Sequence, residues 1–186
     1  MLAHEGKIVY QTEPMKIEVR EHEFSEEVEA GSLLLEVLQT NVCGSELHVF
    51  KGHHPTLKCG VIGHEMIGRI AKLGDNVKTD NAGNPVQVGD RVVPVYFVTC
   101  NQCRECLAGN LHHCIHMYKY QGQSGTFASY YTVHHDQYFF SKCLTACPMR
   151  KRPVRTALSP KSYSALTKSI STRVIPSLFK GPADWD

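Results

Sequence analysis

Gly63-His64-Glu65-Met66-Ile67-Gly68 joins two candidate metal ligands to the start of a candidate strand. The segment Ile67–Leu73 favours a strand because isoleucine is enriched in strands, and the turn signal Leu73-Gly74-Asp75-Asn76 ends it. The pair His64-Glu65 places an imidazole and a carboxylate beside that strand, and Cys43 lies 20 residues before the stretch begins. Imidazole, carboxylate and thiolate are the groups that bind zinc in proteins. The stretch therefore predicts a candidate metal site next to a strand.

Short strands separated by turns are predicted along most of the chain. The segment Lys16–Arg20 alternates polar and apolar residues, as a half-buried strand does, and Leu33–Leu38 is the richer apolar run of a more buried one. Further strands are expected at Arg91–Val98 and Phe127–Val133, and a short helix at Ser45–Phe50. This pattern favours a mainly β fold, a partly open barrel or sandwich with short helices.

Four cysteines stand in tight order at Cys100, Cys103, Cys106 and Cys114. Zinc accepts four thiolates tetrahedrally, and such all-cysteine sites are closed to substrate. An iron–sulfur cluster is the chemical competitor, but its bacterial pattern prefers a proline after the last ligand, where this chain has Ile115. We interpret His112, His113 and His116 as loop residues, although one of them could replace a cysteine. The spacing predicts a structural zinc lobe at about residues 97–117.

A second metal site is predicted around Cys43 and His64. A catalytic zinc takes about three protein ligands and leaves one position open for water or substrate. Glu65 is either the third ligand or a nearby carboxylate that tunes the metal, and Glu46 is expected to orient the His64 imidazole. Taken singly, a cysteine is more often a buried apolar residue and a histidine a hydrogen-bonded core residue. Their joint occurrence beside a tetracysteine lobe favours the metal site, with Cys59 as an alternative ligand that we interpret as a spectator.

Ser45 and His48 form a candidate proton route in the same stretch. A metal-bound alcohol has to lose its proton, and a serine hydroxyl can hand that proton on. A histidine that titrates near neutrality can then release it to water. The alternative interpretation of Ser45 is a helix cap.

These residues resemble the zinc-containing medium-chain alcohol dehydrogenases. The zinc signature of that family reads Gly-His-Glu, two residues, Gly, five residues, Gly or Ala, two residues, and a small or apolar residue. In this chain the signature is met by Gly63-His64-Glu65, Gly68, Gly74 and Val77. The segment Cys43-Gly44-Ser45-Glu46-Leu47-His48 is similar to the family's catalytic cysteine segment, and the four-cysteine stretch to its structural-zinc lobe. The resemblance covers roughly residues 5–140.

The resemblance implies a GroES-like catalytic domain over residues 1–141, folded as a distorted β-barrel with a zinc-binding lobe. It implies that Cys43 and His64 ligate a catalytic zinc, with Glu65 as a neighbour or occasional ligand. Ser45 and His48 would relay the proton. The implied activity is zinc-dependent oxidation of an alcohol to an aldehyde or ketone, with hydride transfer to NAD or NADP.

The chain departs from the family after the candidate barrel. It contains no Gly-x-Gly-x-x-Gly turn to hold a pyrophosphate, and Gly181 is the only glycine after Gly125. The family's usual last ligand of the catalytic zinc is not evident either. We therefore expect a catalytic domain truncated before its nucleotide-binding domain and inactive alone. It would work with a separate nucleotide-binding domain, or self-associate through an uncovered apolar face. The alternative is a non-catalytic zinc-binding remnant or binding module.

Charge is unevenly distributed along the chain. Residues 142–186 hold nine Lys or Arg against two acids, whereas the first 141 residues hold 11 against 16. We interpret 142–186 as an irregular basic tail with little fixed structure, and a frameshift is the preferred explanation of its composition. The tail shows no pattern typical of a helix that recognises base sequence, so no specific nucleic acid partner is expected. The chain lacks an apolar run of membrane-spanning length, and its CxxC-spaced cysteines without an export signal favour the cytoplasm.

Overall fold

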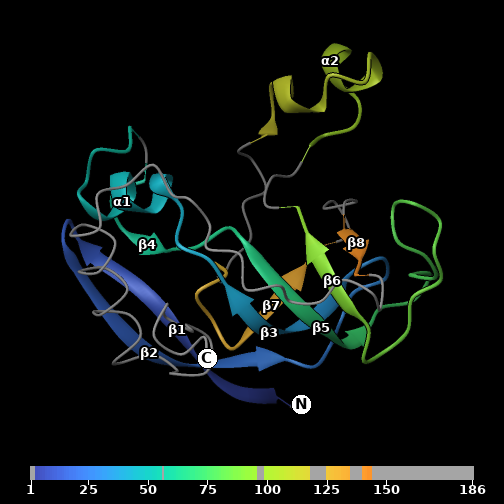
Figure 1. Ribbon diagram of the computed structural model, residues 1–186, viewed down its shortest axis with the longest axis horizontal. Helices are drawn as coiled ribbons and strands as arrows, with labels where there is room; N and C mark the ends of the chain where they lie inside the picture. Colours follow the sequence, from blue (N-terminus) through green and yellow to red (C-terminus); the bar gives the residue numbers. More distant parts are fainter. Residues whose placement is uncertain (1–2, 56, 96–98, 118–124, 135–139, 144–186) are drawn as a thin grey trace, which may run out of the picture.

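The strands of the computed structural model form two antiparallel sheets (Figure 1). The structure describes residues 3–55, 57–95, 99–117, 125–134 and 140–143. One sheet has three strands in the order β2-β1-β4, and the other has five in the order β7-β3-β5-β6-β8. The elements are β1 (Ala3–Glu13), β2 (Lys16–Ser25), β3 (Leu33–Thr40), α1 (Gly44–Phe50), β4 (Gly60–Val61), β5 (Met66–Leu73), β6 (Arg91–Pro94), α2 (Arg104–Leu107), the 3-10 helix η1 (Leu111–His113), β7 (Tyr130–Val133) and β8 (Phe140–Lys142).

The predicted mainly β architecture with short helices is confirmed. The alternation at Lys16–Arg20 becomes part of β2, with Ile17 and Val19 half-buried between exposed neighbours. Two predicted strands are shorter in the structure, since β6 ends at Pro94 and β7 begins at Tyr130. Residues 96–98 of the first of these predictions, and the predicted tail beyond 143, lie outside the described residues. No helix among the described residues is long and apolar enough to cross a bilayer.

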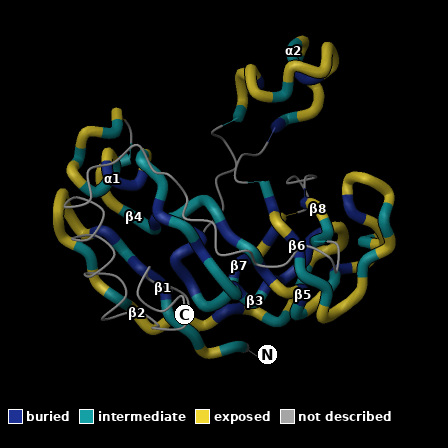
Figure 2. Tube along the Cα trace, in the orientation of Figure 1, coloured by how far each residue is buried: buried dark blue, intermediate teal, exposed yellow. Residues whose placement is uncertain are grey.

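Two of the three apolar clusters of buried residues are close to the elements that carry the candidate site, and Figure 2 marks the buried positions in dark blue. The larger lies on the five-stranded sheet, and β3 and β5 supply most of it. The second joins α1 and β1 through Leu47 and Val9, and it includes the fully buried Phe127. Burying each such side chain contributes about 1.5–3 kcal/mol. This second cluster matters for the site, because it fixes the helix that follows Cys43.

The glycines of the signature have steric reasons in this fold. Gly63 has φ +96°, a backbone conformation that side chains disfavour, and a Cβ there would lie 2.7 Å from the backbone nitrogen of Phe127. A Cβ at Gly74 would lie 2.0 Å from the carbonyl oxygen of Glu29. A Cβ at Gly68 would lie 2.9 Å from the Cβ of Leu35 on the neighbouring strand. The signature therefore encodes close backbone packing around β5 as well as a metal ligand.

Asp80, in the loop between β5 and β6, holds the last described strand. Its Oδ2 accepts the backbone N–H of Lys142 at 2.9 Å, and its Oδ1 accepts those of Ala82 at 2.9 Å and Asn84 at 2.8 Å. The Lys142 N–H and the Asn84 side-chain amide, together with these backbone donors, lower the pKa of Asp80 to about 2. A carboxylate that accepts several N–H groups is held ionised in this way.

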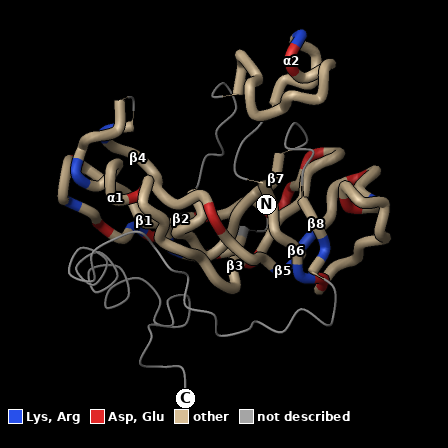
Figure 3. The backbone as a smooth tube through the Cα atoms, turned by 45° about the horizontal axis from the view of Figure 1, so that its top comes forward, with Lys and Arg blue, Asp and Glu red and all other residues tan. Residues whose placement is uncertain are grey.

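The strand β8 pairs with β6 at the edge of the five-stranded sheet. Lys142 lies in β8, and its Nζ is 2.8 Å from a carboxylate oxygen of Asp90. Figure 3 shows basic residues beside β6 and β8, with acidic residues at the same end of the sheet. The backbone N–H of Cys143 donates to the carbonyl of Arg91 at 2.8 Å. These contacts hold β8 against β6.

Replacing Asp80 with asparagine is expected to destabilise the fold at neutral pH, and the effect should fade in acid. The folded pKa of about 2 lies below the ordinary unfolded value of about 3.9. The ionised carboxylate therefore contributes its stability fully above about pH 4 and loses it as the pH falls toward 2. Urea unfolding of both proteins across this range should give midpoints that converge toward about pH 2. A difference that stays constant throughout would contradict this assignment.

Candidate metal centres

Cys43 is placed by the start of α1. It is the N-cap residue of that helix, in an extended conformation, and its sulfur accepts the backbone N–H of Ser45 at 3.4 Å. In return, the carboxylate of Glu46 accepts the backbone N–H of Cys43 at 3.0 Å. The sulfur also accepts the backbone N–H of Glu46, so Cys43 and Glu46 form a capping box with cysteine in the place of serine or threonine. The same local bonds that begin the helix therefore fix the thiol.

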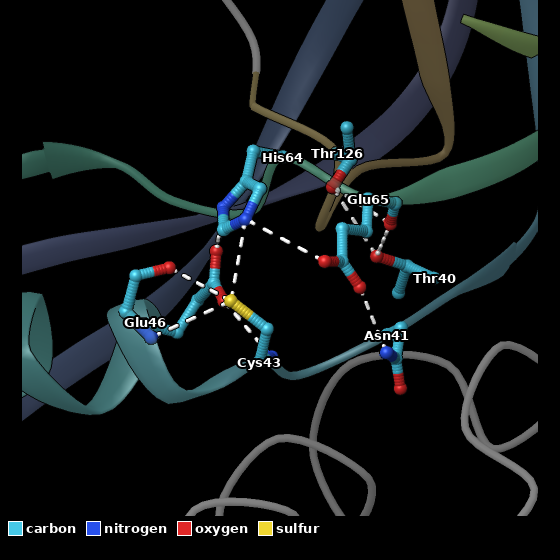
Figure 4. A network of polar contacts seen from close by, with 8 residues as sticks. Thr40, Asn41, Cys43, Glu46, His64, Glu65 and Thr126 are labelled. Atoms are coloured by element: carbon cyan, nitrogen blue, oxygen red, sulfur yellow. Dashed lines mark hydrogen bonds and ion pairs between the residues drawn. The ribbon is translucent and has the colours of Figure 1, made fainter. Parts of the chain in front are cut away.

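His64 faces Cys43 across the site (Figure 4). Its Nε2 lies 3.3 Å from the Cys43 Sγ, and its Nδ1 pairs with Oε1 of Glu46. Glu46 is buried, with only 4% of its side chain exposed. Because Nδ1 donates its hydrogen to this carboxylate, Nε2 presents its lone pair toward the sulfur. The expected orientation of the imidazole by Glu46 is thus seen in the geometry.

Glu65 brings a third donor to the same point. Its Oε1 lies 3.8 Å from the Nε2 of His64, and the donor atoms of Cys43, His64 and Glu65 all lie within 4.8 Å of one another. Ligand atoms around one tetrahedral zinc, at about 2.0–2.3 Å from the metal, are about 3.5 Å apart. The observed spacings are close to that value, so these three residues fit a single zinc ion.

The electrostatics of this centre suit a cation. Burial raises the pKa of the Cys43 thiol; hydrogen bonds from Ser45 oppose this, and the charge of Glu46 adds to it. Burial works against protonation of His64, but the hydrogen bond and charge of Glu46, with the charge of Glu65, outweigh it and raise the pKa of His64. Two carboxylates therefore impose a negative field on the ligand atoms. A divalent metal relieves that field when it replaces the protons.

The two residues of the predicted proton route are both exposed on α1. Ser45 is exposed, and its Oγ is 2.7 Å from the Cys43 sulfur. His48 is one helical turn further along α1, also exposed, with its ring centroid 6.4 Å from that of His53. Residues three apart lie on one helix face, so Ser45 and His48 share a face. Cys59 is exposed and belongs to neither described metal cluster.

Sequence reasoning missed the residues that fix Glu65. Its backbone carbonyl accepts the Thr40 hydroxyl at 2.8 Å and the Thr126 hydroxyl at 3.3 Å, and both threonines are buried. The side-chain amide of Asn41 donates to Oε2 of Glu65 at 2.8 Å. Thr126 comes from the other end of the domain, so no local sequence pattern indicates its role. The position of Asn41, two residues before the candidate ligand Cys43, is the one sequence feature that could have suggested its role.

The four cysteines of the lobe converge as predicted. The Sγ atoms of Cys103 and Cys106 are 3.5 Å apart, and those of Cys114 and Cys100 are 3.6 Å apart. All four sulfurs lie within 4.8 Å of one another. Thiolates around one zinc, at about 2.3 Å from it, lie about 3.8 Å apart. An iron–sulfur cluster distributes its thiolates over separate iron atoms, so this tight group fits a single ion better.

Backbone N–H groups and burial shift the pKa values of these thiols in opposite directions. The N–H groups of Cys106 and Ile115 lower the pKa of Cys103 to about 6. Burial raises the pKa of Cys114, but the N–H groups of Cys100 and His116 outweigh it and lower the value. Burial raises the pKa of Cys106 to about 12, the response of a thiol packed among other sulfurs. A metal that binds all four as thiolates removes this conflict.

The histidines beside the lobe stay outside the four-thiol group. His112 and His113 lie in η1, exposed, with ring centroids 4.2 Å apart. His116 is exposed, and its backbone N–H donates to the Cys114 sulfur at 3.4 Å. The described donor group contains the four cysteines and none of these imidazoles. The expectation of a loop is therefore wrong for His112 and His113, which lie in a short 3-10 helix, although none of the three imidazoles joins the described cysteine group.

The described residues thus contain one group of four cysteines and a second group of one cysteine, one histidine and one glutamate, each able to hold a metal ion. The alcohol dehydrogenase GroES-like domain matches residues 29–142, more than half of the chain. The chain belongs to that family, and the predicted GroES-like fold is confirmed.

Known relatives agree with this assignment. Zinc-type alcohol dehydrogenase B of Aspergillus flavus is 33% identical over 101 residues, which are 54% of this chain and 22% of that protein. L-threonine 3-dehydrogenase of Protochlamydia amoebophila is 36% identical over 112 residues, 57% of this chain and 31% of that protein. The crystal structure of an alcohol dehydrogenase from Escherichia coli CFT073, in complex with NADH, superposes with a TM-score of 0.62 at 28% identity. That match covers 76% of this chain and 39% of that one. The chain therefore spans between about a fifth and two-fifths of these proteins.

Proposed function

We propose that this chain is the catalytic domain of a zinc-dependent alcohol dehydrogenase. The observation that carries the proposal is the convergence of the Cys43 sulfur, the His64 Nε2 and a Glu65 oxygen, with buried Glu46 behind the imidazole. Three ligands leave one tetrahedral position for water or an alcohol. The lobe, with all four of its positions filled by sulfur, has no such opening and serves the structure.

Each residue at the open centre has a distinct task in this proposal. Cys43 and His64 hold the zinc, and Glu65 completes or tunes its ligand set. When bound, the zinc supplies Lewis-acid stabilisation of an alkoxide. The Ser45 hydroxyl would accept the proton of the alcohol on its oxygen and pass its own proton on, and His48, exposed on the same helix face, would take up the relayed proton and release it to water.

The substrate class is a small alcohol, which becomes an aldehyde or ketone as its hydride passes to NAD or NADP. The sequence contains no glycine-rich turn for a dinucleotide, so the cofactor has to be held by a nucleotide-binding domain outside these residues. The named relatives include a threonine dehydrogenase and a zinc-type alcohol dehydrogenase, which is consistent with an alcohol as substrate. Turnover by the chain alone is not expected.

Cobalt substitution tests the open centre without requiring turnover. We expect the protein to bind two equivalents of cobalt(II), both with sulfur-to-metal charge-transfer absorption. Azide should perturb one of the two spectra, because a single site has an exchangeable position. Cys43→Ser should abolish the azide-sensitive spectrum and keep the other, whereas Cys59→Ser, the matched exposed control, should change neither. A single equivalent of cobalt, insensitive to azide, would instead identify a non-catalytic zinc-binding module.

A further inference from the structure

We propose that Asn41 is a positioning residue that holds the Glu65 carboxylate as a ligand of the open metal centre. The inference rests on the function proposed above, because it assigns a role within that same centre. The side-chain amide of Asn41 donates to Oε2 of Glu65 at 2.8 Å, as Figure 4 shows. Neither the zinc signature nor the cysteine segment includes this asparagine.

The backbone of Glu65 is fixed independently of its side chain. Its carbonyl oxygen accepts the hydroxyl of Thr40 at 2.8 Å, the hydroxyl of Thr126 at 3.3 Å and the backbone N–H of Asn41 at 3.3 Å. Thr40 also pairs with Met66 at the end of the β3–β5 ladder. With the main chain held by three donors, only the side-chain torsions decide where the carboxylate lies.

The carboxylate itself would be poorly constrained without Asn41. The Glu65 side chain is 41% exposed, and its Oε1 is 3.8 Å from the Nε2 of His64, too long for a hydrogen bond. An exposed glutamate samples several rotamers, and ordering it costs entropy. The hydrogen bond to Oε2 selects the rotamer in which Oε1 faces the donor atoms of His64 and Cys43.

An amide is well suited to this task. It is neutral, so it holds the carboxylate without cancelling the negative charge that a metal ligand needs. It occupies one oxygen and leaves the other for the metal. Because Asn41 lies two residues before Cys43, the same turn of chain places a thiol ligand and the donor that aims a carboxylate ligand. Loss of such an outer contact typically lowers metal affinity by about 10–100-fold.

The test is a competition titration of cobalt(II) into the full chain, with Asn41→Ala as the variant. We expect the azide-sensitive site to lose about tenfold in affinity, while the four-cysteine site is unchanged. Asn110→Ala is the matched control, because Asn110 donates to Glu105 at 3.2 Å in an equivalent amide–carboxylate contact away from the centre. If Asn41→Ala lowers the four-cysteine absorption, showing a folding defect, Asn41→Leu, which is of similar size and has no donor, supplies the same comparison.

A double-mutant cycle separates positioning from a general structural effect. In a Glu65→Ala background, Asn41→Ala should leave cobalt affinity unchanged, because no carboxylate remains to be aimed. Wild-type affinity in the single variant, or an equal loss in both backgrounds, would overturn the proposal. A wild-type protein that lacks the azide-sensitive site altogether would instead refute the function on which the proposal rests, so the two failures are distinguishable.

Discussion

Replacing Cys103 with serine is expected to release the metal of the lobe and to unfold residues 99–117, while the two sheets stay folded. A serine hydroxyl is a far weaker zinc ligand than a thiolate, so the four-sulfur set is broken. Among the described residues 99–117, the buried side chains are only Thr99, Cys106 and Cys114. Two of these three are themselves ligands, so little apolar burial remains to hold the lobe without its metal.

The magnitudes favour the metal as the source of order in the lobe. Zinc contributes about 10–16 kcal/mol to the folding of small zinc-binding modules. Of the four large apolar side chains of this segment, Leu107 and Ile115 are 75% and 73% exposed, and Leu111 and Met117 are only half-buried, so they contribute little burial. Figure 1 shows α2 set apart from both sheets, so the apolar clusters of the sheets do not extend to it. Loss of the metal should therefore act locally.

Hydrogen exchange read by mass spectrometry, together with zinc content, measures the effect. In the Cys103→Ser variant, amides such as that of Leu107, which donates to the Cys103 carbonyl at 3.0 Å, should exchange at close to the unfolded rate. Peptides from β3 and β5 should keep their protection. The Cys59→Ser variant controls for the loss of an exposed thiol. Retained zinc and retained protection in the lobe would show that the four sulfurs do not hold it together.

The parts of this fold that could be predicted from sequence are those with a short-range cause. Period-two alternation identifies β2, and a continuous apolar run identifies β3, because each strand has to bury a face. Cysteine spacing identifies the lobe, because four thiolates have to reach one ion. The helix α1 follows from the same stretch that supplies Cys43 and Glu46, since its capping box is local.

Other parts could not be predicted, because they depend on contacts between residues far apart in the chain or lie in elements too short to show a pattern. The helices α2 and η1 span four and three residues, which is too short to show a helical period of apolar residues. Backbone hydrogen bonds to the cysteine sulfurs, rather than a buried apolar face, fix this part of the chain. The Thr126 hydroxyl meets the Glu65 carbonyl across 61 residues. Asp80 fixes β8 across 62 residues. Such contacts depend on the sheet topology, which periodicity alone does not specify.

Replacing Glu46 with alanine is expected to lower the affinity of the open centre for zinc or cobalt about 100-fold, the upper end of the range for outer-shell partners. This single buried carboxylate positions two ligands. Its Oε1 pairs with the Nδ1 of His64, and its Oε2 accepts the backbone N–H of Cys43 at 3.0 Å. Without it, the imidazole loses its tautomer and orientation, and the cysteine loses half of its capping box.

The loss of the helix cap has to be separated from the loss of orientation. Removing a cap costs about 1 kcal/mol of stability, which thermal unfolding of the metal-free proteins measures directly. Glu105→Ala is the matched control, because Glu105 is the first-turn acid of α2 and lies beside the other metal site. That variant should leave the affinity of the azide-sensitive site unchanged.

The Glu46→Gln variant decides between charge and geometry. Glutamine keeps one oxygen that can accept the hydrogen of His64 Nδ1, but it turns a donor toward the Cys43 N–H and removes the negative charge. If geometry dominates, its cobalt affinity should stay within about tenfold of wild type; if charge dominates, it should fall as far as that of Glu46→Ala. Wild-type affinity in Glu46→Ala would contradict both accounts, since neither the orientation nor the charge of this carboxylate would then matter. The first result is expected, because the field of Glu65 remains at the centre in both variants and compensates part of the lost charge.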